Sequence, residues 1–168
     1  MLIILSGLSG VGKTTIARAL ATAAGAVHLR IDTIEQALGN LGLTVEAEGY
    51  VVAYALAEDN LRLGRIVIAD SVNPWPLTRD AWRSVAERAG VPGVEVEVVC
   101  SDLTEHRHRV ETRVADIAGH VLPSWQDVVD GDYRPWTRER LVIDSARTTV
   151  DESVEKFWAL FRTPRSRE

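Results

Sequence analysis

The fold of this chain is decided by residues 2–20, LIILSGLSGVGKTTIARAL. Within them, Gly7–Thr14 (GLSGVGKT) fits the pattern G-x-x-x-x-G-K-S/T without exception. Glycines let such a loop wrap so that successive backbone N–H groups point at phosphate oxygens, and the helix that follows adds a dipole that favours anions. The apolar run Leu2–Leu5 predicts a buried strand before the loop, and the alanine-rich stretch after it predicts the helix. These residues therefore predict a strand, a phosphate-binding loop and a helix.

The side chains of the loop indicate which ligand it binds. The ammonium group of Lys13 supplies a positive charge to β- and γ-phosphates, and the hydroxyl of Thr14 is a ligand for Mg²⁺. We therefore predict that the chain binds ATP together with Mg²⁺. The residues predicted to bind the nucleotide in this loop are Gly7, Leu8, Ser9, Gly10, Val11, Gly12, Lys13, Thr14 and Thr15.

Beyond the loop, short apolar runs alternate with longer helical stretches, which is typical of βαβ units around a parallel sheet. Four further strands are predicted, at residues 27–31, 65–70, 94–100 and 141–144. The strand at 27–31 has one polar face, which indicates an edge position. Helices are predicted at residues 46–63, around 82–89, and at 103–118 and 150–161, before a polar tail at 163–168. The pattern predicts one α/β domain over residues 1–168.

The composition limits the partners and the location of the protein. A formal net charge of −5 argues against a long nucleic acid as partner, because proteins that grip one usually carry a basic stripe. Cys100 is the only cysteine, so no internal disulfide is possible, which suits a reducing compartment. No signal peptide is recognisable, and no apolar run approaches the roughly 20 residues that span a bilayer. We expect a cytoplasmic protein without membrane contact.

Four carboxylates stand at or just after predicted strand ends: Asp32, Asp70, Asp102 and Asp144. In an open parallel sheet, ligands bind outside the carboxyl ends of the strands, so each of the four is a candidate site residue. The alternative is that they only form turns and helix caps, which aspartate favours at such positions. The sequence pattern alone leaves both interpretations open.

Three motifs together resemble the small P-loop kinases, in particular the group of chloramphenicol phosphotransferase and the polynucleotide kinase domain. They are Gly7–Thr14, Arg30–Glu35 (RIDTIE) and Ile66–Asn73 (IVIADSVN), and the resemblance extends over nearly the whole chain. It implies the three-layer fold of a kinase-type P-loop NTPase, with a five-stranded parallel sheet and a small helical lid at about residues 104–138. The guanine-reading motif N-K-x-D is absent, which argues against a GTPase switch.

The resemblance implies roles for two of the strand-end carboxylates. Asp32 matches the aspartate that takes the proton of the attacking hydroxyl, and Asp70 matches the aspartate that holds Mg²⁺ directly or through water. The alternative for Asp32 is that it only caps a helix beginning at Thr33. Glu35 follows where polynucleotide kinases are usually more basic, which argues against a nucleic-acid acceptor.

The resemblance also implies roles for three arginines. Arg109 and Arg113 are four residues apart, on one helix face, and match lid arginines that neutralise charge on the γ-phosphate. The alternative is that they pair with Glu105 and Asp116 instead. Arg147 lies in the loop where related kinases hold the adenine, so it either stacks on the base or is an ordinary loop arginine.

Several further side chains have two possible interpretations. Arg79 is either an acceptor-side arginine or a solvated charge on a helix. His106 and His108 lie two residues apart, on different helix faces, and are predicted to be solvated. The aromatic candidates for the crevice are Trp75, Trp125 and Trp136. Each of them either contacts the acceptor or only packs against neighbouring residues.

The sequence thus predicts an ATP-dependent phosphotransferase that moves the γ-phosphoryl group to a hydroxyl of a small molecule. Its predicted catalytic residues are Lys13, Asp32, Arg109 and Arg113, and Thr14 and Asp70 are the predicted Mg²⁺ ligands. One alternative is a nucleotide or polynucleotide 5′-hydroxyl kinase. Another, of a different class, is an ATP-binding switch or slow ATPase that acts through a protein partner. The sequence indicates neither the acceptor nor the oligomeric state.

Overall fold

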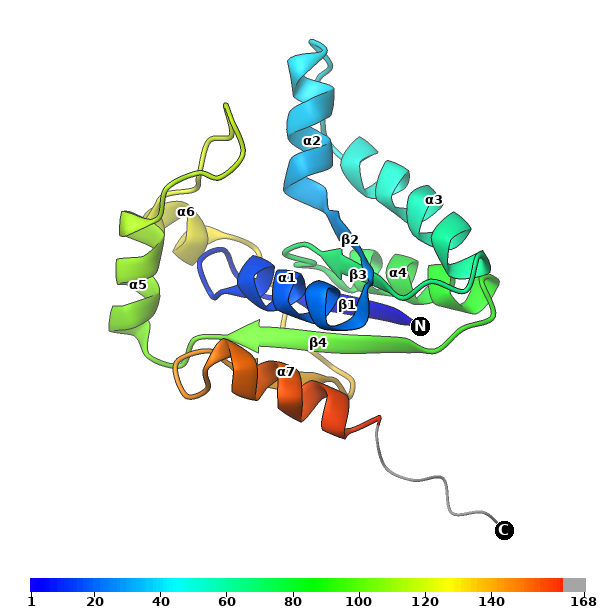
Figure 1. The fold of residues 1–168 in the computed structure, drawn as a ribbon. Helices are drawn as coiled ribbons and strands as arrows, with labels where there is room; N and C mark the ends of the chain where they lie inside the picture. The colour runs from blue at the N-terminus through cyan, green and yellow to red at the C-terminus, as the bar shows by residue number, and fades with distance from the viewer. Residues whose placement is uncertain (162–168) are drawn as a thin grey trace.

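β1 (Leu2–Ser6) is buried along its whole length and forms the middle of the sheet in the computed structural model, which describes residues 1–161. Neighbouring strands are all parallel, and their order across the five-stranded sheet is β2-β3-β1-β4-β5. Figure 1 labels the first four of these strands. The other strands are β2 (Val27–Arg30), β3 (Val67–Asp70), β4 (Gly93–Val99) and β5 (Leu141–Asp144). The predicted parallel sheet is confirmed, and β2 lies at its edge, as its polar face indicated.

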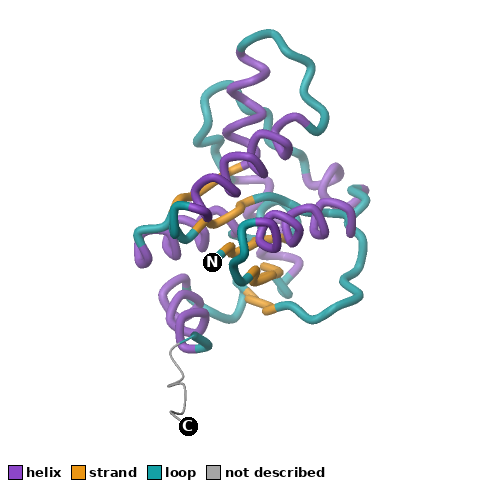
Figure 2. Tube along the Cα trace, turned by 90° about the vertical axis from the view of Figure 1, so that its right-hand side faces the viewer, coloured by secondary structure: helices purple, strands orange, loops and turns teal. Residues whose placement is uncertain are grey.

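Helices cover both faces of the sheet, because successive residues of a strand point to opposite sides. Leu2 and Ile4 pack with side chains of α3 and α4, whereas Ile3 and Leu5 pack with side chains of α1 and α7. Figure 2 shows the strands between the helices. The helices are α1 (Lys13–Ala24), α2 (Ile31–Asn40), α3 (Glu48–Arg62), α4 (Pro76–Arg88), α5 (Leu103–Thr112), α6 (Trp125–Asp130) and α7 (Val150–Ala159). The predicted three-layer α/β fold is confirmed.

The helix predicted at 103–118 is shorter than expected. α5 ends at Thr112, because Arg113 takes an extended backbone with φ −65° and ψ 146°. Residues 113–124 form neither helix nor strand, and α6 then follows within the region predicted as the lid. The helical lid of the prediction is therefore two short helices joined by a coil.

α2 continues directly from β2 and stands away from the sheet (Figure 1). The predicted strand at 27–31 ends at Arg30, and Ile31 already begins the helix. This arrangement places Asp32 in the first helical turn beyond a strand end. The predicted polar tail at 163–168 lies outside the described residues.

Within residues 1–161, no helix combines the length and the apolar character needed to cross a membrane.

Candidate nucleotide and acceptor site

The phosphate-binding loop leaves no room for side chains at two of its glycines. Gly7 has φ +137°, and a Cβ added there would lie 2.2 Å from the carbonyl oxygen of Val98. Gly10 has φ +85°, and its Cβ would lie 2.4 Å from Cγ2 of Val110. The loop therefore lies directly against β4 and α5, in a conformation that L-residues with side chains rarely adopt.

Lys13 is a buried cation at the start of α1. Its side chain is 8% exposed, and Nζ donates a hydrogen bond of 2.8 Å to the carbonyl oxygen of Leu8. Burial lowers the pKa of Lys13 to about 8, although the charges of Asp70 and Asp32 raise it. An anion bound in front of the loop would stabilise the charged form of this lysine, as a phosphate does.

We expect ATP binding to weaken as the pH rises through the pKa of Lys13. Only the protonated amine attracts phosphate, so affinity should fall by up to about tenfold for each pH unit above that pKa. Calorimetric titration of ATP at about pH 7 and about pH 9.5 measures the effect, and two buffers of different ionisation enthalpy report the proton taken up at the higher value. Equal affinity at both pH values would contradict the assignment.

One cavity, of about 970 Å³, joins the loop to the carboxyl ends of the strands. Nearly all the charged residues predicted for the site line it. They are Lys13, Asp32, Asp70, Arg109, Arg113 and Arg147. Ser9, Gly10, Gly12, Thr14 and Thr15 of the loop line it too. Gly7, Leu8 and Val11, also predicted to bind the nucleotide, do not line it.

The four strand-end carboxylates separate into two kinds. Asp102 accepts hydrogen bonds from the N–H groups of Thr104 and Glu105 and caps α5. Asp144 accepts from the N–H groups of Ser101 and Ala146 at 3.0 and 3.1 Å. For these two, the turn and cap interpretation is right. Asp32 does not cap α2, because Arg30 is the N-cap residue and the helix begins at Ile31, so the capping alternative for Asp32 is wrong.

Asp70 is 3% exposed and has a hydrogen-bond partner that sequence reasoning missed. Nε2 of His28 lies 3.1 Å from Oδ2 of Asp70. In the parallel register of β2 and β3, Arg30 lies opposite Asp70, and His28 lies two residues before Arg30. The polar face of the predicted edge strand was the signal that could have identified His28, because residues two apart share a face.

Thr14 and Asp70 fit a magnesium site of the kind that kinases use. Both line the cavity, and a buried carboxylate and a hydroxyl are oxygen ligands of the type that Mg²⁺ prefers. Within residues 1–161 no cluster of three or more His, Cys, Asp or Glu could hold a metal. The ion would therefore be held largely by phosphate and water oxygens, as is usual for Mg²⁺.

The two lid arginines differ in their partners. Arg109 pairs with Glu105 at 2.8 Å, as the alternative interpretation expected, and donates 2.9 Å to Oγ of Ser145. Arg113 has no such pair, because Asp116 pairs with Arg18 and Arg30 instead. Nε and Nη2 of Arg113 are buried without a hydrogen-bond partner in the described chain, and burial lowers its pKa. Arg113 thus lines the cavity and carries two donors that no other group of the described chain uses.

His106 is buried, so its predicted solvation is wrong, whereas His108 is exposed as predicted. Nε2 of His106 lies 2.8 Å from the carbonyl oxygen of Ser9 in the phosphate-binding loop. Its ring packs edge-to-face on Trp125, with centroids 5.1 Å apart. His106 therefore connects α5 and α6 to the loop. Trp125 packs on that histidine and is not among the residues that line the cavity.

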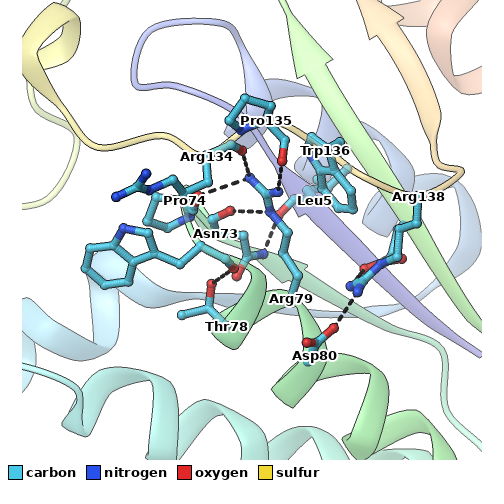
Figure 3. Close-up of polar contacts among 12 residues, drawn as sticks. Leu5, Asn73, Pro74, Thr78, Arg79, Asp80, Arg134, Pro135, Trp136 and Arg138 are labelled. Carbon is cyan, nitrogen blue, oxygen red and sulfur yellow. Dashed lines mark hydrogen bonds and ion pairs between the residues drawn. The ribbon is translucent and has the colours of Figure 1, made fainter.

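Arg79 is buried, so its interpretation as a solvated charge is wrong, and it is not among the residues that line the cavity (Figure 3). Its guanidinium donates to the carbonyl oxygens of Asn73, Pro74 and Arg134 at 2.9, 3.1 and 2.7 Å. It also lies 4.1 Å from the ring centroid of Trp136. These contacts fix residues 134–136 to the loop after β3. The last part of the predicted lid at 104–138 is thus anchored to the body of the domain.

Trp75 and Arg147 are the two remaining candidates, and they differ in their relation to the cavity. Trp75 is exposed and donates through Nε1 to Asp132 at 3.1 Å, and it does not line the cavity. Arg147 lines the cavity with a largely exposed side chain and pairs with Asp144 at 3.2 Å. Contact between Arg147 and adenine stays a prediction.

Comparison with known proteins assigns the chain to a family. Residues 2–130 match the model of the AAA domain family. The chain belongs to this family. No curated protein matches the sequence. The fold of this AAA domain protein is that of the small P-loop kinases, which confirms the resemblance predicted from the sequence.

Three solved structures illustrate the likeness of this AAA domain protein to kinases and related proteins. The Mycobacterium tuberculosis APS kinase in complex with AMPPNP and APS is 19% identical, with a TM-score of 0.75 over 96% of this chain and 97% of that one. A gluconokinase from Sinorhizobium meliloti is 20% identical, with a TM-score of 0.63 over 94% of this chain and 89% of that one. Chaetomium thermophilum Kti12 in complex with ADP-AlF3 is 20% identical, with a TM-score of 0.63 over 95% and 98% of the two chains.

Proposed function

We propose that this protein is an ATP-dependent phosphotransferase that moves the γ-phosphoryl group to a hydroxyl of a small molecule. The observation that carries the proposal is that one cavity is lined by both Lys13 of the phosphate-binding loop and Asp32, whose carboxylate does not cap α2. A phosphate-binding cation and a carboxylate that can accept the proton of a hydroxyl are two groups that phosphoryl transfer to an alcohol uses.

Some residues of the cavity bind the nucleotide, and others act on the acceptor. Lys13 and the loop N–H groups bind the phosphates, and Arg113 adds donors where charge spreads in the transition state. Asp32 orients the acceptor hydroxyl and takes its proton as the oxygen attacks phosphorus. Mg²⁺, held by Thr14 and Asp70 when bound, supplies positive charge to the phosphates. Positioning and electrostatics then contribute most of the rate enhancement.

Measuring ADP release over a panel of acceptors tests the proposal. The panel contains sugars, polyols, nucleosides, hydroxy acids and 5′-hydroxyl oligonucleotides, together with a reaction that lacks any acceptor. A kinase of small molecules gives release that depends on one of the small acceptors. Efficient, salt-sensitive labelling of oligonucleotides alone would favour a polynucleotide kinase. Release independent of every acceptor would favour a switch or slow ATPase.

Arg113→Ala should slow the chemical step more than Arg109→Ala. Arg113 has unpartnered donors in the cavity, whereas Arg109 is already bound to Glu105 and Ser145. Loss of one such donor to the transition state typically costs about 10²–10³ in kcat. Single-turnover rates at saturating ATP measure the step, and ATP affinity should change less than the rate. A wild-type rate for Arg113→Ala would exclude it from the catalytic site.

A further inference from the structure

Two arginines that line the cavity, Arg18 and Arg30, already hold the carboxylate of Asp116. Arg30 donates through Nη1 to both oxygens of Asp116 at 2.9 Å, and Arg18 pairs with the same carboxylate. These hydrogen bonds, from Arg30 first and then Arg18, lower the pKa of Asp116 to about 2. The fork formed by Arg18 and Arg30 therefore strongly favours a negatively charged group.

The carboxylate in this fork comes from a segment with little to hold it. Asp116 lies in the coil at 113–124, between α5 and α6. Its side chain is 41% exposed, and that of Arg18 is 57% exposed. The Arg18–Asp116 pair, exposed on both sides, contributes little net stability, and a coil without ladder hydrogen bonds is among the parts of a protein that open most readily. A ligand with an acid group can therefore displace Asp116.

Of the two arginines in the fork, Arg30 is rigidly placed. The side chain of Arg30 is 11% exposed, and its backbone ends β2, opposite Asp70 in β3. Its Nε is buried and has no hydrogen-bond partner within residues 1–161. Arg30 is thus a fixed binding group, whereas Asp116 is the exchangeable one.

The fork also lies beside the proposed base. Nη2 of Arg30 is 3.4 Å from Oδ2 of Asp32. An acid group on Arg30 and a hydroxyl at Asp32 are therefore close enough to belong to one small molecule. Guanidinium groups bind carboxylate, phosphate and sulfate through paired N–H donors, which also fix the orientation of the molecule that carries the acid.

From these contacts we propose that the acceptor is a hydroxyl compound with an acid group, and that Arg30 and Arg18 bind this group in place of Asp116. The inference rests on the proposed function and assigns it a substrate class. Asp116 is then a stand-in that occupies the fork while the acceptor is absent.

Paired acceptors test the substrate class. Gluconate is compared with glucitol, and glycerate and glycerol 3-phosphate with glycerol, by ADP release under identical conditions. We expect kcat/KM for at least one acid to exceed that of its neutral partner by about tenfold or more, because only the acid can replace Asp116 on the paired N–H donors of the fork. Equal use of an acid and its neutral partner would overturn the inference and leave the kinase assignment standing. ADP release independent of any acceptor would instead refute the proposed function.

Two substitutions should have opposite effects on the KM for the acid. Asp116→Asn removes the competing charge and should lower it, whereas Arg18→Gln removes part of the fork and should raise it by about tenfold. Arg18 is exposed, so its loss should not prevent folding. Asp59→Asn and Arg65→Gln, exposed residues on α3 and just before β3, are matched controls. If Asp116→Asn instead raises KM or slows turnover, Asp116 closes the lid over the acceptor and the inference is wrong.

A binding measurement without ATP covers the case in which no panel acid is phosphorylated. Gluconate and inorganic phosphate should raise the unfolding temperature of Asp116→Asn more than that of the wild type, because the fork is empty in the variant. Arg18→Gln combined with Asp116→Asn should reduce this difference, because only Arg30 of the fork remains. No stabilisation of Asp116→Asn by either anion would overturn the inference.

Discussion

Lys13→Met is expected to abolish measurable phosphoryl transfer while the protein stays folded. Lys13 is the only lysine in the phosphate-binding loop, and its ammonium group lies buried at the cavity. Loss of a preorganised charge at the transferring group costs at least about 10²–10³ in kcat, and ATP affinity falls as well. Calorimetry with ATP and ADP release at saturating acceptor measure the two effects.

The unfolding temperature of Lys13→Met distinguishes a loss of phosphoryl transfer from a folding defect. Below a pH of about 8 the folded protein carries a buried positive charge at Lys13, and burial disfavours that charge. Methionine removes the charge at similar length, so the unfolding temperature at neutral pH should be equal to or above that of the wild type. Lys156→Met, at the other lysine of the chain, exposed on α7, is the matched control and should leave turnover unchanged. Wild-type ATP affinity in Lys13→Met would show that the loop does not bind the phosphates.

The parts of the fold that were predicted correctly are those encoded in local patterns. The apolar run Leu2–Leu5, the glycines of the loop and the polar face of the strand at 27–31 each act over a few residues. The end of α5 is different. Residues 103–118 contain no helix breaker, yet the helix stops at Thr112. Asp116 pairs instead with Arg30 and Arg18, partners 86 and 98 residues away, which no local pattern reveals.

Two residues that sequence reasoning misjudged, His106 and Arg79, share one physical cause, which is burial of a polar side chain against backbone carbonyl groups. His106 meets the carbonyl oxygen of Ser9, and Arg79 meets those of Asn73, Pro74 and Arg134. Every residue type has a backbone carbonyl group, so the sequence does not indicate which residue will accept such a hydrogen bond. For His106 a weak signal existed, because Val110 lies four residues on and both pack on the glycine loop.

Asp32→Asn is expected to lose about 10²–10⁴ in kcat with the true acceptor, which is the range for a positioned general base. The amide keeps the shape of the side chain but cannot take the proton of the hydroxyl. ATP affinity should stay within a few-fold, because Lys13 and the loop hold the phosphates. The measurement belongs near pH 7, because Asp32 raises the pKa of Lys13 and its loss lowers that pKa further.

Asp102→Asn is the matched control for Asp32→Asn. Asp102 also follows a strand, but its carboxylate only caps α5, and asparagine is as good a cap as aspartate. It should therefore retain wild-type turnover and stability. Asp32 has no capping role, and its only ion pair within residues 1–161 is a partly exposed one with Arg30 at 3.4 Å, so its substitution should also cost little stability. A large loss of kcat in Asp32→Asn at unchanged unfolding temperature can then only come from the chemical step or the placement of the acceptor. Wild-type turnover in Asp32→Asn would mean that another group takes the proton.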